Sequence, residues 1–124
     1  MFGRIVNRVR DMFAPRSVVV KNPRVISADE HRIDPALVSA EARATCEALK
    51  RRGFQAYIVG GAVRDLMLGV TPKDFDVATD ATPEQVKRCQ RRAVIIGRRF
   101  KLVHVIFGRE IIECSTFRAL EGAG

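Results

Sequence analysis

The stretch YIVGGAVRDLMLGVTPKDFDVATDAT, residues 57–82, decides the fold of this chain. An apolar run enters the pair Gly60-Gly61, and two carboxylates, Asp74 and Asp76, follow one residue apart. Alternate residues of a β-strand point to the same face, so a strand over residues 74–79 projects both carboxylates from one side. Two such carboxylates near a glycine-rich turn suit Mg²⁺ carrying a nucleoside triphosphate. The plainer alternative is an exposed strand end with two solvated Asp side chains.

Length and charge set the broad class. The chain has 124 residues, which suits a single domain with one core. No apolar run approaches the ~20 residues that a membrane span requires. The formal net charge is +8, and such a surface attracts phosphates, with nucleic acid as the obvious polyanion. A merely soluble cationic surface is the alternative.

The cysteines and the first twenty residues indicate the cellular compartment of the protein. Cys46, Cys89 and Cys114 are odd in number and widely spaced, which argues against a disulfide framework or a zinc site and favours a reducing cytoplasm. The first twenty residues lack the apolar stretch of a secretory signal. Residues 2–13 have the spacing of a basic amphipathic helix, which suits a membrane surface, RNA, a loosely ordered tail or packing on its own domain.

The first half of the chain predicts a tail followed by a helical start. Residues 1–33 are expected to be a basic tail and linker, and residues 34–124 the folded domain. Asp34 and Pro35 predict the cap and first position of a helix that Gly53 ends. A strand over residues 56–59 and a short helix over residues 62–68 follow. The buried stripe of the first helix is predicted to be Val38, Ala42, Thr45 and Leu49.

The second half predicts a helix and three strands. Thr82-Pro83-Glu84-Gln85 is a capping box, so a helix runs to about residue 91. Residues 93–96 form an apolar strand, and residues 102–107 and 110–116 form a hairpin around a two-residue turn. A two-residue turn pairs residues whose numbers add up to 217, so His104 lies opposite Glu113. The expected fold is α+β, a mixed and mostly antiparallel sheet packed with helices.

The Gly60-Gly61 pair joins a strand to a helix. Without side chains, this backbone permits close approach of phosphate oxygens, and Arg64 lies within reach of a phosphate bound there. The alternative for Arg64 is a surface ion pair with Asp65. The pattern is neither a Walker A loop nor a dinucleotide fingerprint, which disfavours a kinase or a dehydrogenase.

These residues together carry a family resemblance. Residues 53–119 resemble the catalytic head of DNA polymerase β-type nucleotidyltransferases, in the branch of bacterial poly(A) polymerases and CCA-adding tRNA nucleotidyltransferases. The segment IIGRRFKLVHV, residues 95–105, is similar to one that marks the poly(A) polymerases. The matching motifs are Gly60-Gly61, Val63-Arg64-Asp65, Lys73-Asp74-Phe75-Asp76, Glu113 and Thr116-Phe117-Arg118.

The resemblance implies a reaction and a site. It implies AMP transfer from ATP to RNA 3′ ends, assisted by two Mg²⁺ ions held by Asp74 and Asp76, with Glu113 as the third catalytic carboxylate. For Glu113, the alternative is a polar residue on a half-exposed hairpin. His104 could orient Glu113 or approach the nucleotide, but a lone strand histidine is more often structural, so it is left outside the catalytic set. The residues implied to bind the nucleotide are Gly60, Gly61, Arg64, Lys73 and Arg118.

The chain departs from the family in length. The family's members are several times longer, and their neck and body domains select the base and grip the RNA. We therefore expect a truncated head that is nearly inactive alone, and robust tailing of RNA by the 124-residue chain would contradict this. Two other functions stay open: CCA addition to tRNA, and a non-catalytic nucleotide- or RNA-binding module. Unchanged magnesium-dependent ATP binding in Asp76→Ala would favour the binding module.

Overall fold

The computed structural model describes residues 24–117. The amphipathic helix expected over residues 2–13, the start of the linker and Arg118 lie outside these residues. Within them, no helix is long and apolar enough to cross a membrane.

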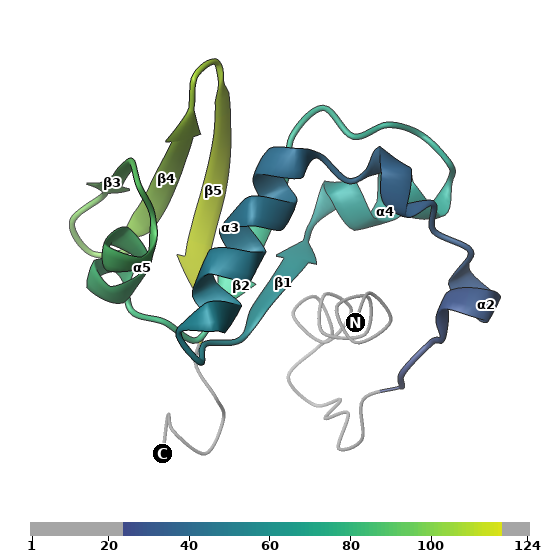
Figure 1. The fold of residues 1–124 in the computed structure, drawn as a ribbon, viewed down its shortest axis with the longest axis horizontal. Helices are drawn as coiled ribbons and strands as arrows, with labels where there is room; N and C mark the ends of the chain where they lie inside the picture. The colour runs from purple at the N-terminus through teal and green to yellow at the C-terminus, as the bar shows by residue number, and fades with distance from the viewer. Residues whose placement is uncertain (1–23, 118–124) are drawn as a thin grey trace.

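A five-stranded sheet organises the domain, in the order β1-β2-β5-β4-β3 (Figure 1). Strands β2 and β5 are parallel, and the other three pairings are antiparallel. The mixed, mostly antiparallel sheet is therefore confirmed, and its one parallel pairing joins the carboxylate strand to the last strand. The strands are β1 (Ala56–Val59), β2 (Asp76–Thr79), β3 (Ala93–Ile96), β4 (Leu102–Phe107) and β5 (Glu110–Thr116).

Two of the helices, α3 and α5, lie against the same face of the sheet (Figure 1). Helix α5 carries the predicted capping box, in which the Thr82 hydroxyl accepts from the Gln85 amide and the Gln85 side chain accepts from the Thr82 amide. A short helix α2 lies within the segment expected to be linker, and the residue after its cap, Ile33, is buried in the core. The helical segments are α2 (Ala28–His31), the 3₁₀ turn η1 (Pro35–Leu37), α3 (Ala40–Arg51), α4 (Gly61–Met67) and α5 (Pro83–Cys89).

The helix predicted to start at Asp34 is divided in two. Asp34 does cap, accepting from the Ala36 amide at 2.9 Å, but the turn that it starts is only η1. Val38 then has an extended backbone and is 8% exposed, because it turns inward to join the core. Ser39 caps α3 instead, accepting from the Ala42 amide at 3.1 Å. All four residues of the predicted stripe are buried, but Val38 lies before α3 and only the other three belong to the helix. The helix ends just before Gly53, as predicted.

The two caps differ in how much helix they support, and this gives a first prediction. We expect Ser39→Ala to lower the free energy of unfolding by about 1 kcal/mol, because it removes a cap of the 12-residue helix α3. Asp34→Ala should cost less, because only one exposed turn follows that cap. Urea denaturation followed by circular dichroism measures both, and an Asp34 variant that loses more stability than the Ser39 variant would contradict this assignment.

The core lies between the helices and one face of the sheet. Val77, Val103, Val105, Ile112 and Cys114 point from the strands toward α3 and α5, and each is at most 1% exposed. Burial raises the pKa of Cys46 to about 11 and that of Cys114 to about 12, so both remain thiols at neutral pH. Because strand residues alternate, the neighbours of these core residues project from the opposite face of the sheet. We call this opposite side, which carries Asp76, His104 and Glu113, the open face.

Candidate active site

One row of paired residues crosses the whole open face. Val59 pairs with Asp76, Asp76 with Glu113, Glu113 with His104, and His104 with Val94. Adjacent strands lie about 4.8 Å apart, so residues of one row are immediate neighbours. The row therefore places two carboxylates and an imidazole side by side at the centre of the sheet, between two valines.

The His104–Glu113 pair confirms the hairpin register predicted from the two-residue turn. The His104 Nε2 atom lies 3.5 Å from Glu113 Oε2, and the two side chains are 27% and 46% exposed. This contact leaves the Glu113 carboxylate open to solvent.

Asp76 is the most electrostatically perturbed carboxylate of the row. Partial burial, and then the negative charges of Glu113 and Asp74, raise the pKa of Asp76 above its ordinary value of 3.8. A carboxylate with two like charges nearby is poised for a cation, because a cation would relieve both the repulsion and the cost of desolvation. The electrostatics therefore favour a positively charged ligand at this point of the sheet.

Gly60 closes the site on the β1 side. Its backbone has φ 78° and ψ −152°, a conformation that residues with a side chain rarely adopt. A Cβ atom built on Gly60 would lie 3.2 Å from Asp76 Oδ2, so only glycine leaves that oxygen clear. The sequence indicated Gly60 as a point of phosphate approach, but it gave no sign of this contact, because the contact depends on how the turn folds over β2.

Asp74 is not placed as predicted. Strand β2 begins at Asp76, so alternation along a strand does not put Asp74 on the open face. The cause lies in the partner strand: the antiparallel register would pair residue 74 with Gly61, which already belongs to α4. Asp74 is an exposed loop residue whose charge nevertheless acts on Asp76 and on Glu110.

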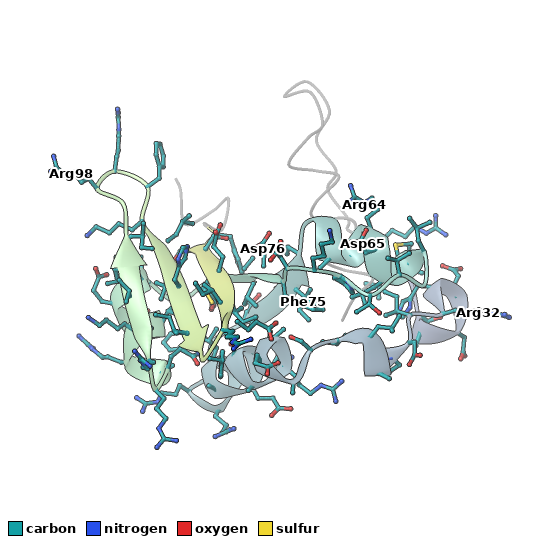
Figure 2. The ribbon with its side chains drawn as sticks, turned by 90° about the horizontal axis from the view of Figure 1, so that it is seen from above. Arg32, Arg64, Asp65, Phe75, Asp76 and Arg98 are labelled. Carbon is teal, nitrogen blue, oxygen red and sulfur yellow. The ribbon has the colours of Figure 1, made fainter. Side chains whose placement is uncertain are left out.

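Two of the predicted phosphate-binding cations, Arg64 and Lys73, lie at the surface. The Arg64 guanidinium is 3.5 Å from the Asp65 carboxylate, which is the surface ion pair considered as the alternative. The same guanidinium would lie 3.5 Å from a Cβ on Gly61, so it folds back over the glycine pair. Figure 2 shows Arg64 and Asp76 on the side of the molecule away from α3, with Phe75 pointing the other way. Lys73 is exposed in the preceding loop.

The carboxylates suit a hard cation that shares its coordination with a substrate. Within residues 24–117, no three His, Cys, Asp or Glu side chains gather into a ready metal cage. Mg²⁺ commonly takes only one or two protein carboxylates and completes its shell with water and substrate phosphates, and Asp76 beside Glu113 fits that habit. A hollow of about 350 Å³ lies elsewhere, against η1 and α3, and contains none of these residues.

Comparison with known proteins identifies the class. The model of the poly(A) polymerase head domain family matches residues 56–123, so the chain belongs to that family. Poly(A) polymerase I of Haemophilus influenzae is 55% identical over 96 residues, which cover 77% of this chain and 21% of that protein. Poly(A) polymerase I of Salmonella typhi is 44% identical over 124 residues, covering 95% and 27%.

CCA-adding enzymes are similar at a lower level. That of Staphylococcus aureus strain Newman is 37% identical over 81 residues, covering 65% of this chain and 20% of that protein. The crystal structure of the Bacillus stearothermophilus CCA-adding enzyme with CTP matches at a TM-score of 0.60 and 35% identity, over 73% of this chain and 25% of that one. These similarities confirm the nucleotidyltransferase-head fold. The chain spans about a quarter of the length of the poly(A) polymerases that it matches.

Proposed function

We propose that this chain carries the catalytic site of an RNA nucleotidyltransferase that adds AMP from ATP to RNA 3′ ends. The observation that carries the proposal is the pairing of Asp76 with Glu113 on the open face, with Gly60 against Asp76. Family membership supports the reaction class, and the greater identity to poly(A) polymerases than to CCA-adding enzymes supports ATP as the substrate. Messenger RNA is the substrate that this reading implies, and three free thiols suit the cytoplasm.

In this proposal, the residues divide the work by charge. Asp76 and Asp74 hold two Mg²⁺ ions, Glu113 serves as the third catalytic carboxylate, and His104 keeps Glu113 oriented. The chemistry supplied by bound Mg²⁺ is a lower pKa of the attacking 3′-hydroxyl and neutralisation of charge on the phosphates. Gly60 and Gly61 leave space for phosphate oxygens. The cations that neutralise the triphosphate are Arg64, Lys73 and Arg118.

A chimera tests the function directly. The chain replaces the matching segment of the Salmonella typhi poly(A) polymerase I, and the purified chimera is given labelled ATP or CTP with an RNA primer. We expect ATP-dependent tails, which would show that the carboxylates of this chain support transfer; the preference for ATP over CTP in this chimera belongs to the parent's neck. A chimera that folds like its parent, judged by circular dichroism and gel filtration, yet adds no nucleotide would overturn the proposal.

CCA addition is the second candidate, and the similarity to the CCA-adding enzymes favours it. Because the neck selects the base, two chimeras are compared on tRNA without its terminal CCA: the one above, and one in which the chain replaces the matching segment of the CCA-adding enzyme of Staphylococcus aureus strain Newman. Ordered addition of two CMP and one AMP by both chimeras would replace the polyadenylation proposal, whereas tailing by ATP alone in both would eliminate CCA addition.

A further inference from the structure

A tight loop of residues 97–101 joins β3 to β4. Gly97 has φ 98°, and a Cβ atom there would collide with the Phe100 carbonyl oxygen, so the turn folds closely on its own glycine. At the other end of the loop, the Lys101 ammonium lies 3.6 Å from the Glu84 carboxylate of α5. A glycine turn thus lies at one end of the loop and a surface ion pair at the other.

This loop holds an aromatic ring out in the solvent. Phe100 is 83% exposed, more than any other large apolar side chain among residues 24–117. A single exposed apolar residue requires no explanation by itself, because folded surfaces contain many. Phe100 differs because it is aromatic, sits on a restrained loop and has two arginines directly before it.

The neighbouring charges select for an anion. Arg98 and Arg99 are both exposed, and within the described part of the chain neither forms an ion pair. Exposed guanidinium groups beside an aromatic ring match the two chemical parts of a nucleotide, its phosphate and its base. A purely apolar partner would leave both guanidinium groups without a counter-charge.

The loop also lies on the same side of the sheet as the carboxylates of the open face. Figure 2 shows Arg98 projecting on the side away from α3, the same side as Asp76. Lys101, the residue directly before β4, precedes His104 by three residues, which is about 10 Å along a strand. His104 belongs to the row that contains Glu113 and Asp76. A strand of RNA that ends at the carboxylates can therefore pass over this loop.

We propose that Phe100, Arg98 and Arg99 form a stacking site for single-stranded RNA, which holds a nucleotide of the primer behind its reacting end. The proposal deepens the function proposed above and rests on it. The ring stacks on one base, and the two guanidinium groups contact the flanking phosphates. Stacking is tolerant of sequence because every base has a π-face, which suits an enzyme that extends different RNAs.

A tryptophan reporter tests for stacking. The chain contains no Trp, so Phe100→Trp introduces a unique fluorophore that can still stack. We expect an adenosine oligonucleotide of RNA to quench its emission saturably. Leu68→Trp is the matched control, because Leu68 is also a highly exposed apolar residue, at 70%, but follows α4. Equal quenching in both variants would overturn the proposal.

Affinity measurements separate the ring from the charges. With a labelled RNA oligonucleotide in fluorescence anisotropy, we expect Phe100→Ala and Phe100→Leu to bind about five-fold more weakly or worse, while Phe100→Trp retains its affinity. Each phosphate contact on a single strand contributes about 0.7 to the slope of log Kd against log salt. The double variant Arg98→Gln, Arg99→Gln loses two such contacts, so its slope should be lower by about 1.4. Unchanged affinity in Phe100→Ala, or equal competition by duplex RNA, would overturn the stacking site.

The same variants distinguish this proposal from the proposed function. Magnesium-dependent ATP binding should be equal in the original chain and in Phe100→Ala. Saturable quenching of Phe100→Trp by RNA, without any tailing by the chimera, would support the RNA site while refuting nucleotidyl transfer. If the chimera adds tails, and Phe100→Ala changes neither the tailing nor the affinity for the primer, the result would support nucleotidyl transfer and refute the RNA site.

Discussion

Asp76→Asn should abolish nucleotidyl transfer in the chimera, with a fall of about 10³-fold in kcat/KM for ATP. The loss corresponds to about 4 kcal/mol of transition-state stabilisation, within the range that a bound metal provides. Asparagine has nearly the shape of aspartate but no charge, so the change removes the carboxylate at the centre of the row without emptying its place. Single-turnover incorporation of labelled AMP measures the effect. Asp29→Asn, in the exposed first turn of α2, is the matched control and should leave the rate unchanged.

The same substitution should stabilise the metal-free fold. Because the folded-state pKa of Asp76 is raised, the folded protein loses stability as the pH rises through that pKa and the carboxyl ionises. The asparagine amide does not ionise, so Asp76→Asn should have the higher Tm at pH 7. Below the ordinary pKa of 3.8 the Asp76 side chain is protonated in both the folded and the unfolded original chain, and this advantage should disappear.

Added Mg²⁺ should reverse the order of the two proteins at pH 7. A cation that binds only the folded state raises Tm, so the original chain should gain stability and Asp76→Asn should gain little. Differential scanning fluorimetry with Mg²⁺, and with Na⁺ at matched ionic strength, measures the difference. A variant that is less stable than the original chain without metal, or that responds equally to Mg²⁺, would refute the role assigned to Asp76.

The sheet was the part of the molecule most accessible from sequence. The hairpin has a two-residue turn, which leaves one register unless a bulge intervenes, so the opposition of His104 and Glu113 could be predicted to the residue for a hairpin without a bulge. Strands β1 and β3 also begin and end where the apolar runs do. These are local properties, decided by turns and by residues near in the chain.

Features that depend on distant partners could not be predicted in the same way. The start of β2 is decided by the end of its partner β1 at Val59, so an alternation pattern that includes Asp74 overstates the strand. Likewise, Val38 has an extended backbone because its side chain packs in the core, so α3 begins after it and is capped by Ser39 instead of Asp34. The parallel pairing that brings Asp76 beside Glu113 joins strands far apart in the chain, and no local signal encodes it. Family resemblance indicated that both carboxylates belong to one site.

Gly60→Ala should damage both the fold and the site. Alanine at φ 78° and ψ −152° is strained, which should lower the free energy of unfolding by about 1–3 kcal/mol. Its methyl group would also meet Asp76 Oδ2 at 3.2 Å, so the carboxylate must move by a few tenths of an ångström. Small displacements of a catalytic group are costly, and we expect transfer by the chimera to fall about 10²-fold.

Gly69→Ala separates backbone strain from crowding of the carboxylate. Gly69 has a similar φ of 73°, but a Cβ atom there would have no neighbour within 4 Å. It should therefore lose about 1–2 kcal/mol of stability while retaining transfer activity and the Mg²⁺-dependent rise in Tm. If both variants were to retain activity, Gly60 would matter only for the turn. If Gly60→Ala alone loses transfer at a temperature where both are folded, the missing side chain at Gly60 is what keeps the Asp76 carboxylate in place.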